Sequence, residues 1–428
     1  VWKVYFESCG CASNRCDVEV MLGCVVRAGY SVTEDLDEAD VVVINTCAVK
    51  TPTESRMLNR IRVLKGAGKP IVVAGCLPKI NLSGIRKVTG GEFVVLDPQS
   101  IDRIVEAVEV ALTSRGECII FSERPPVKPS LPKVRLNPVV EVVQIAEGCV
   151  GSCTYCCTRF ARGRIHSYPI AEIVDRVSSA VRDGVKEVWL TGQDVGAYGI
   201  DLGVDVTDLL EAICELDGEF IIRLGMMNPN RIKRIKDRLA EIYSDEKVFK
   251  FLHIPVQSGD DKVLRDMNRG YSVNDFIELI EYFRDKVPEI SIATDVICGF
   301  PTETDKAFNN TLKLISDVKP DVLNISKFFP RPKTPLWRKK TLPYKVVKSR
   351  SRRMAELFRR ISLERNMRWV GWRGEVLIDE KGFGESWIGR NFAYKPIVVR
   401  SSDNLLGEKL YVKVTKACPT HLEGEIVK

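Results

Sequence analysis

The chain has 428 residues, of which 45% are hydrophobic and 28% are charged. At about 150 residues per domain this length predicts two to three domains, and the composition excludes a disordered or fibrous protein. No apolar run approaches the roughly 18 residues that a membrane span needs, so we expect no membrane contact.

The chain is rich in cysteine for a protein with no visible export signal. Its first residues, Val1-Trp2-Lys3-Val4, show no such signal, so we expect a cytoplasmic protein. It has 14 cysteines, and a reducing cytosol argues against disulfides. Ligation of a metal or a cluster is the leading explanation, and the alternative is that most cysteines are small buried hydrophobic side chains.

Residues 1–124 alternate short β-branched runs with amphipathic stretches. The runs predict strands at Lys3 to Phe6, Val41 to Asn45 and Ile71 to Ala74, with helices between them. This alternation is typical of a doubly wound parallel α/β domain. Residues 125–138 follow as an extended linker, because Pro125, Pro126, Pro129, Pro132 and Pro138 prevent a regular element.

Residues 139–335 contain a second βα series, which predicts a partial TIM-like barrel with six strands. In such barrels the chemistry lies at the carboxyl ends of the strands. The predicted strands are Glu141 to Ile145, Glu187 to Leu190, Phe220 to Leu224, Phe251 to Ile254, Ile290 to Ile297 and Val322 to Ser326.

Residues 336–369 are predicted to form a basic helical segment. Between Arg338 and Arg368 the net charge is +10, in a chain whose total is +7. A basic stripe this local is typical of a site for a polyanion such as RNA, and the alternative is a solvated helix face. Residues 370–428 alternate as strands and predict a small all-β barrel, with strands at Glu375 to Ile378, Lys395 to Val399, Lys409 to Val414 and Gly424 to Val427.

The strongest local signal is the C-x3-C-x2-C pattern of Cys149, Cys153 and Cys156, which follows the first barrel strand. Four thiolates complete an ordinary [4Fe-4S] cluster, whereas three leave one iron free to bind another ligand. Zinc is the competing interpretation, but it usually takes C-x2-C pairs and a fourth His or Cys.

A second set of three cysteines is spread over the amino-terminal domain. Cys11, Cys47 and Cys76 each follow one of its predicted strands. Parallel strands deliver their carboxyl ends to one edge of the sheet, where doubly wound folds bind ligands. We therefore expect the three thiols to converge and to bind another cluster with an open iron.

These patterns resemble the radical S-adenosylmethionine (SAM) methylthiotransferase family over nearly the whole chain. Its members acting on N6-threonylcarbamoyladenosine (t6A), of the archaeal and eukaryotic type, are the most similar. The terminal barrel resembles a TRAM domain, an RNA-binding module. The motifs that carry the resemblance are Gly10-Cys11-Ala12-Ser13-Asn14, Asn45-Thr46-Cys47-Ala48-Val49-Lys50-Thr51-Pro52-Thr53-Glu54, Val73-Ala74-Gly75-Cys76-Leu77-Pro78, Cys153-Thr154-Tyr155-Cys156 with Ala161-Arg162-Gly163, Thr191-Gly192-Gln193-Asp194, Met267-Asn268-Arg269 and Pro330-Arg331-Pro332.

The resemblance implies two [4Fe-4S] clusters, SAM as cofactor, and conversion of t6A at position 37 of the tRNA anticodon loop to its 2-methylthio derivative. One SAM methylates a sulfur on the auxiliary cluster, and another gives the radical that removes hydrogen from adenine C2. The two clusters should then face one shared cavity. The alternative substrates are isopentenyladenosine in tRNA and an aspartate of a ribosomal protein. A non-catalytic iron-sulfur protein that binds RNA or acts as a sensor is the alternative of another class.

The same resemblance implies residues that contact SAM, and Tyr155, Gln193, Asp194, Arg223 and Gln257 are the candidates. Arg223 could pair with the SAM carboxylate, or form an ion pair inside the barrel. A sulfur donor and an electron donor are further implied, and we expect a monomer.

Two cysteines depart from the family pattern. Cys9 precedes Gly10-Cys11 where relatives have an aromatic residue, and Cys157 stands where many have Lys. Packing is the expected role of Cys9, with ligation in place of Cys11 as the alternative.

Overall fold

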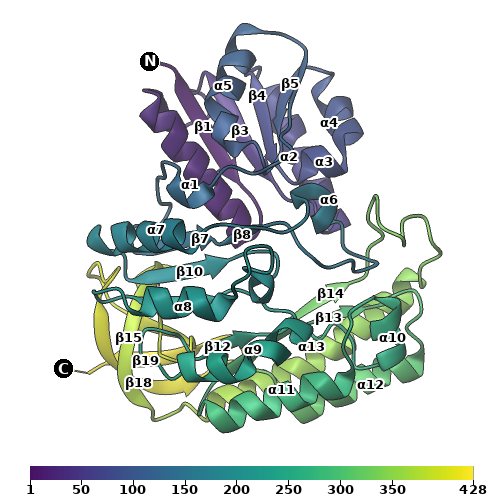
Figure 1. Ribbon diagram of the computed structural model, residues 1–428, viewed down its shortest axis with the longest axis vertical. Helices are drawn as coiled ribbons and strands as arrows, with labels where there is room; N and C mark the ends of the chain where they lie inside the picture. Colours follow the sequence, from purple (N-terminus) through teal and green to yellow (C-terminus); the bar gives the residue numbers. More distant parts are fainter. Residues whose placement is uncertain (428) are drawn as a thin grey trace.

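The computed structural model describes residues 1–427. Figure 1 shows an α/β domain at the top, a second α/β unit in the middle and a β-barrel at the lower left, in chain order from purple to yellow. The fold class predicted from the sequence, with its doubly wound domain, partial barrel and terminal β-barrel, is confirmed.

The amino-terminal sheet has six parallel strands in the order β2-β1-β3-β4-β5-β6. Three of them were predicted, and three short ones, β2, β5 and β6, were not. The bounds are β1 (Lys3–Ser8), β2 (Ser31–Thr33), β3 (Val41–Thr46), β4 (Ile71–Gly75), β5 (Phe93–Leu96) and β6 (Glu117–Ile120).

Helices cover both faces of this sheet. On one face α1 and α5 pack on Val4, Val41 and Val43, and on the other α2 and α4 pack on Val42 and Ile44. The strand order reverses between β1 and β3, and doubly wound folds bind their ligands at the carboxyl edge of such a reversal. The helices are α1 (Ala12–Arg27), α2 (Thr51–Gly66), α3 (Leu77–Ile80), α4 (Leu82–Thr89) and α5 (Ile104–Thr113).

The middle unit is an open barrel made of two parallel sheets with the strand orders β11-β10-β7 and β12-β13-β14. Its six main strands lie where they were predicted, within one or two residues at each end: β7 (Val140–Gln144), β10 (Glu187–Thr191), β11 (Ile221–Leu224), β12 (Phe251–His253), β13 (Ser291–Cys298) and β14 (Val322–Lys327). A short pair, β8 (Ala146–Glu147) and β9 (His166–Ser167), follows β7. The helices are α6 (Thr158–Arg162), α7 (Ile170–Arg182), α8 (Val206–Cys214), α9 (Pro229–Ile242), α10 (Asp261–Asp266), α11 (Val273–Lys286) and α12 (Asp305–Val318).

A long helix, α13 (Tyr344–Met367), connects the open barrel to the terminal barrel and packs against β14 and α12. The terminal barrel is closed, with the strand order β15-β16-β17-β19-β18. One of its strands, β16, was not predicted. The strands are β15 (Arg373–Lys381), β16 (Ser386–Arg390), β17 (Pro396–Arg400), β18 (Lys409–Ala417) and β19 (Leu422–Ile426).

The three units contact one another through two different ends of the open barrel. The amino-terminal domain packs α1 against β7 and faces the loops at the carboxyl ends of the barrel strands. The terminal barrel contacts the opposite end, where the amide of Lys250, just before β12, donates to the carbonyl of Phe392 at 2.8 Å. Within residues 1–427 no helix is long and apolar enough to cross a membrane.

Candidate active site

The first three candidate cysteines lie in loops at one edge of the amino-terminal sheet. Cys11 precedes α1, Cys47 directly follows β3, and Cys76 directly follows β4. Since β1, β3 and β4 are adjacent parallel strands, their loops open on the same side. Gly75 adopts φ +93°, and a Cβ there would lie 2.4 Å from Asn45 Oδ1, so this turn requires glycine.

The side chain of Asn14 holds these three loops together. Its Nδ2 donates to the carbonyls of Cys9 at 3.1 Å and Thr46 at 3.0 Å. Its Oδ1 lies 3.7 Å from Cys11 Sγ and 4.0 Å from Cys76 Sγ. One buried amide therefore contacts two of the candidate ligands and fixes the strand end that leads to the third.

Burial controls the ionisation of the deeper thiols. It raises the pKa of Cys76 to about 12, and the neighbouring Cys11 and Cys47 thiolates raise it further while Arg162 opposes the shift. Burial also raises the pKa of Cys47. A thiol must lose its proton to bind metal, so these thiols ionise at neutral pH only when a cationic group such as iron replaces the proton.

The second triplet lies on the loop between β8 and α6. The amide of Gly151 donates to Cys149 Sγ at 3.2 Å, and Arg269 Nη1 donates to Cys153 Sγ at 3.3 Å. Burial raises the pKa of Cys149 to about 12 and raises that of Cys156, and the thiolates of the same loop add to both shifts. Arg269 is buried, so it places a positive charge beside thiols that carry negative charge once they bind metal.

Gln193 bridges the two sets of cysteines. Its Oε1 accepts a hydrogen bond from the amide of Gly148 at 2.7 Å, directly before Cys149. Its Nε2 donates to Ser13 Oγ at 3.1 Å, two residues after Cys11. A single side chain at the end of β10 thus joins both cysteine loops.

Further contacts join the other cysteine loops across the same interface. Cys157 Sγ donates to the carbonyl of Ala48 at 3.4 Å, so the residues that directly follow Cys156 and Cys47 touch. Arg331 Nη2 donates to the same carbonyl at 2.6 Å and forms an ion pair with Glu54. Cys157 and Cys9 both belong to the apolar cluster under α2, which favours packing for each of them.

A buried charge network lies behind Asn14. Arg162 Nη2 donates to Asn14 Oδ1 at 2.9 Å and to Asp17 at 2.7 Å, and Arg162 Nη1 donates to Glu147 at 2.8 Å. Lys128 of the linker donates to both carboxylates at 2.5 Å. All four charged side chains are at most 1% exposed, so two cations and two anions neutralise each other between the domains.

Three of the predicted SAM contacts lie beside the second triplet. Asp194 Oδ1 accepts from the amide of Asn228 at 3.0 Å, and burial raises the Asp194 pKa to about 6. Tyr155 packs edge-on against Phe300, with ring centroids 6.5 Å apart. Gln257 lies four residues after the end of β12. Its backbone amide donates to the carbonyl of Asp295 at 2.7 Å.

Arg223 lies elsewhere. Its guanidinium carbon is 5.3 Å from the ring centroid of Trp189 and 5.5 Å from those of Phe251 and Tyr394. Tyr394 comes from the terminal barrel, which packs at the amino ends of the strands. The guanidinium therefore lies among aromatic side chains, and no carboxylate of residues 1–427 pairs with it.

Sequence reasoning did not assign roles to Asn14, Arg162, Arg269 and Lys128. The first three lie inside the motifs quoted above, so their positions could have suggested a role. Lys128 lies in the proline-rich linker, where nothing distinguishes it from a solvated lysine. Its partners Asp17 and Glu147 are 111 and 19 residues away along the chain.

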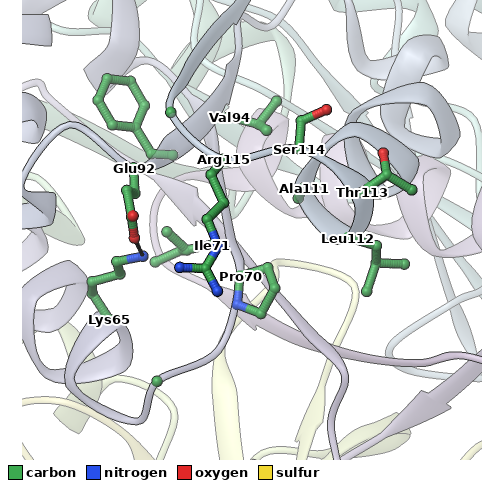
Figure 2. A pocket seen from close by; sticks show the side chains of 13 residues that line it. Lys65, Pro70, Ile71, Glu92, Val94, Ala111, Leu112, Thr113, Ser114 and Arg115 are labelled. Carbon is green, nitrogen blue, oxygen red and sulfur yellow. Dashed lines mark hydrogen bonds and ion pairs between the residues drawn. The ribbon is translucent and has the colours of Figure 1, made fainter.

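A separate hollow of about 430 Å³ lies at the opposite edge of the amino-terminal sheet. Figure 2 shows Lys65 paired with Glu92 and Arg115 beside Ile71 at its wall. The lining residues lie at the amino ends of β4 and β5, whereas the cysteines follow the carboxyl ends. We therefore assign no part of the cysteine chemistry to this hollow.

Three family models match the chain in series. Residues 3–96 match the uncharacterized protein family UPF0004, residues 143–315 match the Radical SAM superfamily, and residues 368–427 match the TRAM domain. Among solved structures, the radical SAM methyltransferase TsrM from Kitasatospora setae superposes with a TM-score of 0.58 at 13% identity, covering 89% of this chain and 79% of that one. At this identity the match supports the fold alone.

Relatives with assigned names match over the full length of this chain. A probable threonylcarbamoyladenosine tRNA methylthiotransferase of Pyrococcus abyssi is 42% identical, over 99% of both chains. The threonylcarbamoyladenosine tRNA methylthiotransferase of Homo sapiens is 36% identical, over 100% of this chain and 74% of the human one. The chain belongs to the family of the threonylcarbamoyladenosine tRNA methylthiotransferases, which are radical SAM enzymes.

Proposed function

We propose that Cys149, Cys153 and Cys156 hold one [4Fe-4S] cluster and that a second is held by Cys11, Cys47 and Cys76. Each set offers three thiols, so each cluster keeps one iron free of protein ligands. Support comes from the convergence of each set and from the buried guanidinium beside it, Arg269 in one case and Arg162 in the other. A nearby guanidinium stabilises the negative charge of a thiolate, and Arg162 acts to lower the pKa of Cys76 in this way.

The protein transfers a methylthio group to N6-threonylcarbamoyladenosine in tRNA, as its family membership indicates. Within the structure, the observation that carries this function is the hydrogen-bond bridge of Gln193 between the two cysteine loops. A sulfur carrier and a radical source must lie close together if a short-lived carbon radical is to be trapped. When bound, SAM and the two clusters supply the radical and the methylthio group.

We propose that four side chains near the second triplet bind and orient the cofactor. Tyr155, Gln193, Asp194 and Gln257 are proposed to bind SAM. With its pKa near 6, Asp194 is mostly ionised at neutral pH and can accept hydrogen bonds from an ammonium or a ribose hydroxyl. Gln193 also positions the loop before Cys149, and each of its polar atoms keeps one further hydrogen-bonding capacity for SAM.

The reaction also requires a sulfur donor and an electron donor, which we propose are separate proteins or small molecules. We further propose that the enzyme acts as a monomer on the anticodon stem-loop. The support is that all six cysteines, the bridging Gln193 and the interface between them come from one chain.

Product analysis tests the function. We expect that the reconstituted holoprotein, given reductant, SAM and sulfide, converts tRNA bearing t6A to the 2-methylthio nucleoside. Matched tRNA bearing unmodified adenosine or isopentenyladenosine should give no such product by mass analysis of nucleosides. Product from the isopentenyl substrate alone would overturn the assignment, and a protein that makes no 5′-deoxyadenosine would be a non-catalytic binder.

Single cysteine variants separate the two clusters. Cys149→Ala should abolish 5′-deoxyadenosine formation, because the site that binds SAM loses one of three ligands. Cys47→Ala should retain it but lose the methylthio product. Cys214→Ala is a suitable control, because Cys214 is a partly buried thiol at the end of α8, distant in the fold from both loops. Normal methylthio product from Cys47→Ala would remove Cys47 from the ligand set.

A further inference from the structure

The interior of the open barrel is polar and partly exposed. Val188, Ile222 and Leu252 point outward into the apolar core beneath the helices. Side chains alternate along a strand, so their neighbours Trp189, Arg223 and His253 face the interior. In a closed TIM barrel this interior is filled by branched apolar side chains. Here the interior residues keep partial exposure, as His253 does at 16% and Asp295 at 25% of the side chain.

Arg223 is the notable group in this interior, because its charge has no anion beside it. Three aromatic rings lie within 5.5 Å of its guanidinium carbon, and such rings compensate a partly buried cation only in part. Its Nε is buried and has no hydrogen-bond partner. Its other two nitrogens are not buried, and within residues 1–427 no acceptor bonds to them. A partly exposed guanidinium with unused donors is a site for a carboxylate or phosphate.

Arg15 places a second guanidinium against the same Trp189 ring. Its carbon lies 5.4 Å from the centroid of the Trp189 ring that Arg223 also contacts. Glu19 accepts from Arg15 Nε at 2.9 Å, but Nη2 is buried without a partner. Arg15 lies one helical turn after Cys11, and its amide donates to the Cys11 carbonyl at 3.0 Å. The two arginines therefore connect the neighbourhood of the auxiliary cysteines to the barrel interior.

The depth of Arg223 favours a ligand that reaches below the cysteine loops. Phe251 begins β12 and Tyr394 belongs to the barrel that packs at the amino ends of the strands, so the rings around Arg223 mark the deep end. In adenine, N1 lies between C2 and C6, and C6 carries the N6 substituent. A base that aims C2 at the mouth of the barrel therefore directs its N6 substituent away from the mouth.

We propose that Arg223, together with Arg15, binds the carboxylate of the threonylcarbamoyl group of the substrate base. This inference rests on the proposed function, and it names the subsite by which the enzyme recognises its modified nucleoside. Asp295 accepts hydrogen bonds from His253 at 3.1 Å and from Asn324 at 2.7 Å on the same interior face. These polar groups suit the hydroxyl and urea groups of the same arm.

The first test changes the substrate and leaves the protein unaltered. Two anticodon stem-loops are compared with the holoenzyme, one bearing t6A and one bearing its carboxamide, in which the carboxylate is neutral. We expect kcat/KM for methylthio transfer to fall about 10- to 100-fold for the carboxamide, the range expected when a charge-assisted hydrogen bond is removed. Equal rates for the two substrates would overturn the proposal.

The second test asks whether Arg223 is the group that discriminates. In Arg223→Gln we expect the two substrates to react at similar, reduced rates, whereas Arg223→Lys should keep part of the preference for the carboxylate. Arg234→Gln is the matched control, because Arg234 is exposed on α9 and loses the same charge. Wild-type discrimination in Arg223→Gln would also overturn the proposal.

SAM carries a carboxylate too, and the same variants distinguish the two sources. Binding of the SAM carboxylate by Arg223 would raise the KM for SAM and slow 5′-deoxyadenosine formation without RNA in Arg223→Gln, which would contradict the proposal. We expect both to stay at the wild-type values. Failure of the function itself has a different signature, since the wild-type enzyme would then make no methylthio product from t6A.

Discussion

At the scale of single residues, Asn14 is the centre of the auxiliary site. Its amide contacts the thiols of Cys11 and Cys76 on one side and the guanidinium of Arg162 on the other. A neutral side chain here can accept from the guanidinium without repelling the thiolates. Its two donor hydrogen bonds also fix the loops after β1 and β3.

Asn14→Asp should therefore weaken the auxiliary cluster selectively. The carboxylate adds a like charge beside two thiolates and cannot donate the two hydrogen bonds that the amide makes. We expect iron to fall from about eight to about four atoms per chain, with 5′-deoxyadenosine formation retained. Asn59→Asp, at an exposed position of α2, is the control. Full iron content in Asn14→Asp would show that the amide is dispensable.

The candidate cysteine ligands could be predicted from the sequence, but the residues that hold them in place could not. Cys11, Cys47 and Cys76 could be predicted because each follows a strand, and parallel strands place their ends at one edge. Arg162 contacts Asp17, 145 residues earlier in the chain, and no local pattern specifies that interaction. Arg223 could be placed on its strand, but its surroundings depend on Tyr394, which a different domain supplies.

At the scale of elements, the amino end of β10 connects the open barrel to the terminal one. Glu187 begins β10 and is fully buried, and its Oε1 accepts from the indole of Trp189. Burial and then the charge of Asp379 on β15 raise the Glu187 pKa from 4.5 to about 8. Burial raises the pKa of Asp379 as well, while Arg390 at 3.1 Å opposes that shift.

This raised pKa predicts that alkaline pH destabilises the fold. Between about pH 4.5 and pH 8 the folded protein keeps a proton that the unfolded chain has released, so stability falls as pH rises through that range. Glu187→Gln keeps the acceptor for Trp189 and should reduce the slope by the contribution of Glu187. We expect its thermal midpoint to exceed that of the wild type at pH 9 but not at pH 5. Parallel curves for the two proteins would contradict the prediction, and Glu246→Gln, an exposed change, is the control.

Three strands of the amino-terminal sheet that the sequence did not predict are short. The strand β2 has three residues, and β5 and β6 have four each, too few for an alternation to stand out from chance. They form because a neighbouring strand of the sheet provides each of them with partners for its backbone hydrogen bonds. The six main barrel strands were predicted because their apolar runs are separated by helices of regular spacing.

At the scale of the whole molecule, the charge of α13 divides into two parts. Arg350 pairs with Glu303 at 2.7 Å and Arg365 with Asp321 at 2.9 Å, so the face toward the barrel is neutralised. The other face carries exposed arginines. A surface that keeps its positive charge after folding is the one that RNA phosphates can use.

Neutralising the exposed face of α13 should therefore weaken tRNA binding and reduce its dependence on salt. The variant changes Arg352, Arg353, Arg359 and Arg360 to Gln, all of them exposed, and Arg352 forms only a solvent-exposed pair with Glu356. Each phosphate that no longer has a cationic partner lowers the slope of log Kd against log salt by about 0.7 to 0.9. We expect a slope lower by up to about 3, measured by tRNA binding over a series of salt concentrations.

The control for the α13 variant is a second variant with the same charge change on the amino-terminal domain. Its four changes to Gln are at the exposed residues Arg27, Arg62, Lys87 and Arg115. Long-range attraction alone would lower the salt dependence equally in both variants, because each loses four positive charges. Direct binding of phosphates by α13 predicts a larger effect in the α13 variant. Equal slopes would mean that this helix face serves solvation and that RNA is held by other surfaces.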